Sequence, residues 1–275
     1  MSQLIDNLNT IESIKTDIKA AIENKGVDMT GVSFPGYASK IGEISGGGGG
    51  WDQKDITERN IEITNLDNSA SFVASHAFLN NITIQTVNLP YATSVGNYAF
   101  QNCSSLKQVD LPMCRYINNG CFSACRSLAQ VSLPMCSKID AYAFQNCSSL
   151  TQMSLSMCSS IGFAAFSACR SLAQVSLPVC SYIGYYAFMN CSSLTQMSLP
   201  MCSKIDNYAF QNCSSLSIIT IGYSSLCSLY NSNVFNKTQI TSSTGSIFVP
   251  TSLVESYKSA NNWSYFSTQI FPISE

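Results

Sequence analysis

A phenylalanine recurs every 22 residues through most of this chain, and this period limits the possible folds more than any other feature. It ends Ala-Phe or similar pairs, and the series comprises Phe78, Phe100, Phe122, Phe144, Phe166, Phe188 and Phe210. A constant period of about 20 to 50 residues is the signature of a solenoid, whose repeats each bury an apolar side against the next. The sequence therefore predicts stacked turns stabilised by their neighbours and not by one central core.

Each repeat also carries the pattern L-x-x-V-x-L-P, which predicts a short strand. Apolar residues two apart indicate a strand with one buried side, and proline ends it because it has no N–H to donate to a ladder. The prolines are Pro90, Pro112, Pro134, Pro178 and Pro200. Strands from successive turns are expected to pair in parallel at about 4.8 Å.

A second apolar column precedes the Ala-Phe pair and is expected to fill the core from the convex side. Its members are Val95, Ile117, Ile139, Ile161, Ile183 and Ile205. A longer period of 44 residues is superimposed, because FSACRSLAQVSLP at 122–134 recurs unchanged at 166–178. The duplicating unit is therefore a pair of turns.

The motifs N-C-S-S-L, L-P and I-x-x-x-A-F together resemble the BspA-like class of bacterial leucine-rich repeats, over residues of about 60–275. The resemblance implies an α/β leucine-rich-repeat solenoid with its parallel sheet on the concave face. SIFVPTSLVESYKSANNWSYFSTQIFPISE resembles the closing segment of that family. We accordingly expect a solenoid over 51–246 and a C-terminal cap over 247–275.

Residues 1–45 read as a separate helical module, joined to the solenoid by five glycines at 46–50. Apolar residues occupy two heptad positions, as in a short amphipathic helix. They are Leu4, Ile11 and Ile18 at one position and Ile14 and Ala21 at the other. Isoleucine at both positions favours a homotrimer, while a monomeric packing helix is the alternative. A glycine run is a flexible linker.

The run IKAAIENKGVDMTGVSFPGYASKIGEI resembles N-terminal segments of tail and fibre proteins from phages and prophages of gut bacteria. This resemblance implies attachment to other virion or tail proteins. BspA-like proteins are usually exported with a signal peptide, whereas this sequence begins without a basic start followed by an apolar run. A phage protein leaves the cell by lysis and needs no such signal.

The low charge of the chain argues against nucleic acid and membranes as partners. Only 11% of residues are charged and the formal net charge is -2, so the chain lacks the basic field that attracts phosphate. No stretch reaches the roughly 18 apolar residues that a membrane helix needs. We expect neither nucleic-acid binding nor membrane insertion.

The residues needed for catalysis or cofactor binding are sparse. His76 is the single histidine, and Asp140 and Asp206 are the only acids between residues 111 and 254. Three turns separate the two acids, or about 14 Å, beyond the roughly 5 to 10 Å that paired carboxylates require. The glycine run lacks the Lys-Ser/Thr of a phosphate loop. We predict no catalytic residue, no cofactor and no enzyme activity.

Eleven of the thirteen cysteines form two ladders at the 22-residue period. The first is Cys103, Cys125, Cys147, Cys169, Cys191 and Cys213, and the second is Cys114, Cys136, Cys158, Cys180 and Cys202. Zinc needs close pairs with a matching partner pair, which these spacings do not supply, so no metal is expected. Stacked side chains point in parallel and do not automatically reach disulfide geometry. Cysteine is interpreted as a small apolar filler of the turn.

The residues between the apolar positions of each strand are the candidate binding residues. They form one column of glutamines and a second of serines with one acid: Gln108, Gln130, Gln152, Gln174 and Gln196, and Asp110, Ser132, Ser154, Ser176 and Ser198. Amides and hydroxyls suit sugars or extended peptides. The alternative is a solvated strand face. A further candidate contact surface is the turn aromatics Tyr98, Tyr116, Tyr142, Phe163, Tyr182, Tyr185, Tyr186 and Tyr208.

These patterns predict a non-enzymatic binding or structural protein. The first hypothesis is a phage tail-associated adhesion or receptor-binding protein, assembled in the bacterial cytoplasm and carried on the virion tail, whose solenoid meets a bacterial surface glycan or protein. The alternative is a BspA-like bacterial cell-surface protein that mediates adhesion to host or extracellular matrix.

Overall fold

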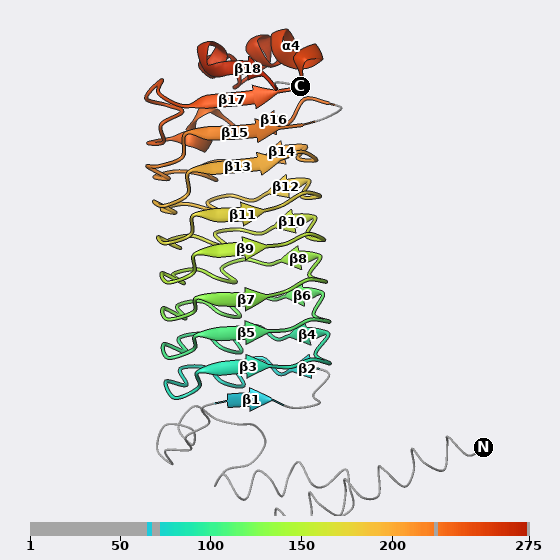
Figure 1. Ribbon diagram of the computed structural model, residues 1–275, viewed down its shortest axis with the longest axis vertical. Coiled ribbons are helices and arrows are strands. Elements are labelled where there is room, and N and C mark those ends of the chain that lie inside the picture. The colour runs from blue at the N-terminus through green and yellow to red at the C-terminus, as the bar shows by residue number, and fades with distance from the viewer. Residues whose placement is uncertain (1–64, 68–71, 223–224, 274–275) are drawn as a thin grey trace, which may run out of the picture. The chain divides into compact units, whose positions relative to one another are not determined.

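The computed structural model describes residues 65–67, 72–222 and 225–273, which cover most of the predicted solenoid and its closing segment. The predicted helical module at 1–45, its heptad residues and the glycine linker at 46–50 lie outside the described residues. The described residues form a parallel-stranded solenoid of 22-residue turns (Figure 1), so the fold predicted from the period is confirmed. Helix occurs only near the C-terminal end of the described residues, and the repeats themselves are strand and turn.

The L-x-x-V-x-L segments form the odd-numbered strands, which stack along one side of the solenoid (Figure 1). In β3 to β13 the apolar residue in the middle of the pattern points toward the core and its two polar neighbours point outward, as alternation in a strand requires. The strands are β1 (Asn65–Asp67), β3 (Thr86–Asn88), β5 (Gln108–Asp110), β7 (Gln130–Ser132), β9 (Gln152–Ser154), β11 (Gln174–Ser176), β13 (Gln196–Leu199), β15 (Ile218–Ile221) and β17 (Ser246–Val249).

The odd-numbered face is divided into two sheets. The ladder runs in the order β1-β3-β5-β7 and then, in a second sheet, β9-β11-β13-β15-β17-β18. Within each sheet equivalent residues pair, so that Gln108 lies opposite Gln130 and Gln152 opposite Gln174. The single concave sheet expected from the sequence is therefore interrupted between β7 and β9.

The second apolar column forms a sheet of its own, which the sequence did not predict. Eight two-residue strands pair in parallel in the order β2 to β16, and each supplies one buried residue of that column or its equivalent. They are β2 (Phe72–Val73), β4 (Ser94–Val95), β6 (Tyr116–Ile117), β8 (Lys138–Ile139), β10 (Ser160–Ile161), β12 (Tyr182–Ile183), β14 (Lys204–Ile205) and β16 (Ser228–Leu229).

The core is built from columns of identical side chains that stack on their own copies. Phe100, Phe122, Phe144, Phe166 and Phe188 are fully buried, and successive rings lie nearly parallel with centroids 5.3 to 5.4 Å apart. Stacked parallel strands bring equivalent residues to about this spacing. Each turn therefore packs mainly against the equivalent residues of the turns before and after it, as expected for a solenoid.

A third segment of each turn holds two residues with left-handed backbone, four positions apart. Tyr98 and Asn102 have φ near 57° and 60°, a conformation that asparagine tolerates better than most residues. The N–H groups of Tyr98, Phe100 and Asn102 all donate to carbonyls of the next turn, at 2.8 Å. The same bonds recur along the solenoid and all run in one direction. Aligned peptide dipoles add, so this segment carries a dipole along the solenoid axis.

The closing segment lies over the last turn (Figure 1), and its aromatic side chains pack against that turn. After β17 come a short 3-10 turn (η3, Thr251–Leu253), α4 (Val254–Ser259), η4 (Ser264–Gln269) and β18 (Ile270–Pro272). Trp263 and Tyr257 are buried, and the Trp263 indole N–H donates to the Cys227 carbonyl at 2.6 Å. The Tyr257 hydroxyl accepts from the Cys227 N–H at 2.9 Å. Among the described residues no helix is long and apolar enough to cross a membrane.

Candidate functional site

The glutamine and serine columns line a groove on the odd-numbered face. The groove has a volume of about 1010 Å³ and extends from β5 to β15. All ten candidate residues line it: Gln108, Asp110, Gln130, Ser132, Gln152, Ser154, Gln174, Ser176, Gln196 and Ser198. The five strands that carry them lie side by side in Figure 1, so the candidate residues lie along one surface.

The strand register decides how these side chains are arranged. Because paired strands have no offset, Gln108 lies beside Gln130 and Gln152 beside Gln174, about 4.8 Å away in each case. The five glutamines are exposed, and so are the four serines. Asp110 is half-buried at one end of the groove and is the only ionisable residue among those that line it. The groove is thus a nearly neutral double row of amides and hydroxyls.

Further groove residues were missed by the sequence analysis. Ala129 and Thr151 precede the glutamines, and Ile218 and Thr220 continue the two polar columns by one turn. Counting 22 residues onward from Gln196 and Ser198 would have found the last two. Ile218 gives this end of the groove an exposed apolar residue in place of an amide.

The inward-facing residues of the groove strands differ between alternate turns. All four of these residues line the groove, but Met153 and Met197 are buried at 2% and 1% exposure, whereas Val131 and Val175 remain partly exposed. Val131 lies on β7, the strand at which the ladder is interrupted. The groove floor therefore combines polar rows with small apolar patches at a spacing of two turns.

The charged residues considered for catalysis lie outside the groove. His76 stacks on the Tyr98 ring at 5.4 Å, and the Asp140 carboxylate pairs with Lys138 at 2.8 Å on the even-numbered sheet. In the described residues no group of three or more His, Cys, Asp or Glu is arranged to hold a metal ion. Neither His76 nor Asp140 lines the groove.

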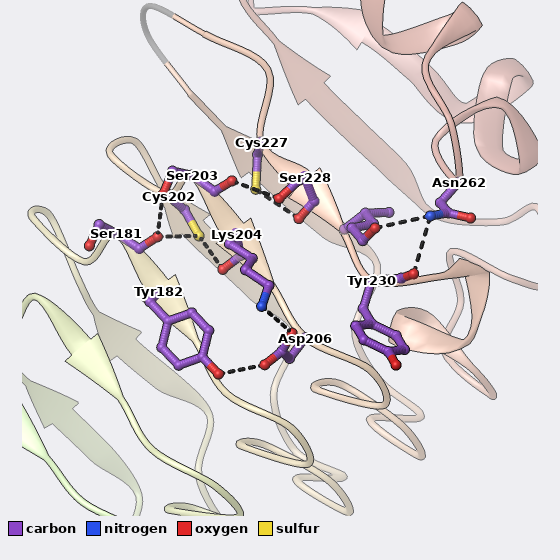
Figure 2. A network of polar contacts seen from close by, with 11 residues as sticks. Ser181, Tyr182, Cys202, Ser203, Lys204, Asp206, Cys227, Ser228, Tyr230 and Asn262 are labelled. Atoms are coloured by element: carbon purple, nitrogen blue, oxygen red, sulfur yellow. Dashed lines mark hydrogen bonds and ion pairs between the residues drawn. The ribbon is translucent and has the colours of Figure 1, made fainter.

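Asp206 belongs to a polar network on the even-numbered sheet near the C-terminal end (Figure 2). Its carboxylate accepts a hydrogen bond from the Tyr182 hydroxyl and pairs with Lys204 at 3.0 Å. Partial burial and this hydrogen bond raise the pKa of Tyr182 to about 12. Serine hydroxyls continue the network, since Ser203 donates to the Ser181 carbonyl and Ser228 to that of Ser203. These contacts connect one turn to the next.

The cysteines do more than fill space. All thirteen are buried free thiols. In the first ladder each Sγ donates to the carbonyl of the phenylalanine one turn earlier, at 3.0 to 3.1 Å, as Cys147 does to Phe122. In the second ladder each donates to the carbonyl two residues ahead, as Cys136 does to Lys138 at 3.4 Å. The interpretation as apolar filler is corrected, because each ladder cysteine also supplies a hydrogen-bond donor.

Burial also sets the acidity of these thiols. Removal from water disfavours the thiolate and raises the pKa of Cys136, Cys169 and Cys180 to about 12. A thiol with so high a pKa is a poor nucleophile and a poor metal ligand at neutral pH. These ladder cysteines are therefore suited to structure and not to chemistry.

The turn aromatics form a continuous cluster over four turns. The Phe163 and Tyr185 rings stack at 5.6 Å with an angle of 5° between their planes, and Tyr186 stacks on Tyr208 at 5.3 Å. Tyr142 meets Phe163 edge-on at 5.1 Å. The cluster therefore combines stacked and edge-on ring contacts, and Tyr142 and Phe163 remain partly exposed at its surface. Of the other aromatics considered, Tyr98 packs on His76, and Tyr116 is half exposed.

Comparison with known proteins places this architecture among bacterial leucine-rich repeats. A family model described as "BspA type Leucine rich repeat region" matches residues 56–156 and 137–263. No curated protein matches the sequence.

Two solved structures of bacterial proteins are similar. A leucine rich cell surface protein of Faecalibacterium prausnitzii is 27% identical with a TM-score of 0.54, covering 57% of this chain and 47% of that one. A leucine-rich repeat protein of Bacteroides ovatus is 25% identical with a TM-score of 0.54, covering 69% of this chain and 51% of that one. The chain thus spans about half the length of either protein.

Proposed function

This chain belongs to the BspA-type leucine-rich repeat family, and from that premise we propose that it is a non-enzymatic adhesion protein that holds a neutral polymer in its polar groove. The observation that carries the proposal is the convergence of ten amide, hydroxyl and carboxylate side chains on one groove of about 1010 Å³. Amides both donate and accept hydrogen bonds, and hydroxyls do likewise, so the rows complement ligands rich in hydroxyls or peptide groups.

The repeat of the groove favours an extended ligand. The same pair of side chains returns every turn, about 4.8 Å apart, over five strands. A glycan chain or an extended peptide repeats its own polar groups along its length and can use several turns at once. The nearly uncharged lining favours neutral ligands, since a charged group would lose hydration without gaining a partner of opposite sign.

A position on the bacterial cell surface is the first form of this proposal. It is supported by the Faecalibacterium prausnitzii neighbour, described as a leucine rich cell surface protein. In this setting the groove binds a polymer of the host or extracellular matrix.

A phage tail-associated adhesion protein is the second form. Its support is the resemblance of the sequence around residues 18–44 to N-terminal segments of phage tail and fibre proteins. In this setting the N-terminal module attaches to other tail proteins, its heptad positions form a trimer, and the groove binds a bacterial surface glycan or protein.

The location of the protein separates the two forms. Antibody against the solenoid labels intact bacteria in the first form, whereas in the second it co-sediments with virions after prophage induction. The protein is followed in both fractions of the same culture, and its presence in neither fraction contradicts both forms.

The groove itself is tested by binding to a panel of soluble bacterial and host polysaccharides. We expect the double variant Gln152→Ala/Gln174→Ala to raise the dissociation constant of the polysaccharide at least tenfold in isothermal titration. The reason is that hydrogen-bond partners are lost at two of the turns. Ser181→Ala is the matched control, because this exposed serine directly precedes β12 on the other side of the solenoid, and it leaves binding unchanged. Equal binding by the groove variant, or turnover of the polysaccharide by purified protein, would contradict the proposal.

A further inference from the structure

Large apolar side chains form a stripe along the solenoid, in the turns between each odd-numbered strand and the even-numbered strand after it. Figure 1 shows these turns stacked on one another. One residue per turn contributes, and each is between 43% and 59% exposed. The members of this stripe are Tyr91, Met113, Met135, Met157, Val179 and Met201. Six turns at about 4.8 Å make it about 24 Å long.

The side chains of the stripe do not belong to the hydrophobic core. The residue after each member is fully or almost fully buried, as Cys114, Cys136 and Cys158 are, so the core at this corner is already filled. The glutamine and serine columns of the same turns are polar, and exposed aromatics such as Tyr116 and Phe163 do not recur at every turn. The stripe, by contrast, places a large apolar residue in water at the same position of six consecutive turns, which marks an interaction surface.

We propose that this methionine-rich stripe is the contact surface for a second, antiparallel copy of this chain. A second copy has the same spacing between turns, so its side chains stay in register with the stripe over all six positions. A partner with another spacing, such as a helix with a rise of about 5.4 Å per turn, cannot keep its side chains opposite the stripe residues along the same length. Methionine is flexible and adapts well at such contacts.

The size and charge of the surface fit this partner. With on the order of 200 Å² of accessible surface for a large side chain, six half-exposed members present about 600 Å². The neighbouring prolines, such as Pro134 and Pro178, extend the patch toward the roughly 800 Å² that each partner buries in a standard interface. The stripe carries no charge, so two copies meet without like-charge repulsion.

The antiparallel arrangement follows from the order of the side chains and from the dipole of the turns. Two-fold symmetry makes one patch meet itself, and here it places Met135 opposite Met157 nearest the axis and Tyr91 opposite Met201 at the ends. The hydrogen bonds donated by Tyr98, Phe100 and Asn102 and by their equivalents all run to the next turn, so this segment of each solenoid carries an axial dipole. Antiparallel copies bring opposite ends of these dipoles together.

The mass of the full chain in solution tests the proposal. All proteins carry Ile11→Asn and Ile18→Asn, so that any association through the N-terminal heptads is removed. Sedimentation then gives a dimer at high concentration, and Met135→Ser/Met157→Ser raises its dissociation constant at least tenfold. Gln152→Ser, an exposed groove substitution, leaves the dimer unchanged. A monomer at all concentrations, or a dimer indifferent to the methionine substitutions, overturns the proposal.

Cross-linking tests the direction of the contact. A mixture of Tyr91→Cys and Met201→Cys chains is treated with a copper(II) complex, and an intermolecular disulfide forms between the two variants. Two copper(II) ions take the two electrons and become copper(I), and the two thiol protons pass to the buffer. The native cysteines are buried and remain reduced. If Tyr91→Cys alone cross-links with itself as efficiently as the mixture does, the antiparallel arrangement is wrong.

Discussion

The central turns, residues 98–221, and the closing end, residues 225–273, cover their buried aromatic side chains in different ways. In the central turns a buried side chain packs on its own copy, so the Phe144 ring lies between Phe122 and Phe166. At the closing end there is no further copy, and Phe235 instead meets Trp263 at 6.1 Å and Phe266 at 5.4 Å. Repetition supplies the partner in one region, whereas bulky, dissimilar aromatics supply it in the other.

The comparison explains which residues can vary. A buried column tolerates little change because each member packs against the equivalent residue of the turn on either side. An exposed column, such as that of the glutamines, is not constrained by packing in this way. At the closing end the constraint shifts to hydrogen bonding, because Trp263 and Tyr257 satisfy the backbone of Cys227 as well as covering the turn. The following predictions test these differences, from the largest effect to the smallest.

Alkali is expected to have the largest effect, and to act through the central turns. Burial raises the pKa of Cys136, Cys169 and Cys180 to about 12, whereas a thiol in the unfolded chain has a pKa of about 8.5. Between these values the unfolded chain binds fewer protons than the native protein, so the free energy of unfolding falls as pH rises.

The expected loss is on the order of 1.4 kcal/mol per pH unit for each such thiol, so the protein unfolds between about pH 9 and 12. Urea titrations at a series of pH values measure the slope. The slope is shallower in Cys136→Ala, which removes one of these thiols, and a stability that does not change above pH 9 contradicts the role of thiol burial.

Removing one ring from the phenylalanine column is the next largest change. Phe144→Ala leaves a cavity between two stacked neighbours, and we expect it to lower the free energy of unfolding by about 3 to 5 kcal/mol. Phe163→Ala is the control, because that ring is 39% exposed and belongs to the surface cluster. Urea denaturation that shows equal losses for the two variants would contradict the distinction between core column and surface cluster.

At the closing end, Trp263→Phe keeps an aromatic ring and removes the indole N–H. The buried Cys227 carbonyl then loses its 2.6 Å hydrogen bond, and we expect a cost of about 1 to 3 kcal/mol. Tyr265→Phe is the matched control, since Tyr265 is 72% exposed, and it changes stability by less than about 0.5 kcal/mol. If Trp263→Phe left the free energy of unfolding unchanged, the C-terminal cap would stabilise the protein by packing alone.

A single ladder thiol has a smaller effect. Cys147→Ala removes the S–H donor to the Phe122 carbonyl, but that carbonyl still accepts from the Cys125 N–H at 3.2 Å. We therefore expect a loss of about 1 kcal/mol, measured by thermal and urea unfolding. A loss as large as that of Phe144→Ala would mean that the thiol hydrogen bond contributes more than its weak donor suggests.

The smallest effect on stability is expected in the groove. Gln152→Ala replaces an exposed side chain and changes the free energy of unfolding by less than about 0.5 kcal/mol. A larger loss would mean that stacked amides stabilise the face, which is the alternative to a binding role.

Much of the site and fold could be read from spacing. The 22-residue interval from Phe100 to Phe122 predicts stacking, and the alternation around Val109 correctly places Gln108 and Asp110 outward. The second sheet was missed because two-residue strands such as Tyr116–Ile117 are too short for alternation to be recognised. The thiol donors were missed because composition alone does not reveal which carbonyl lies beside a cysteine.

By itself the sequence determined the period, the buried columns and the order of polar and apolar residues on each strand, because these depend on neighbours within one repeat. Only the tertiary structure decided that the ladder is interrupted between β7 and β9, that the thiols bond to phenylalanine carbonyls a turn away, and that the polar rows enclose a groove. These features depend on how successive turns lie on one another, and interatomic distances between turns are not encoded in a period along the chain.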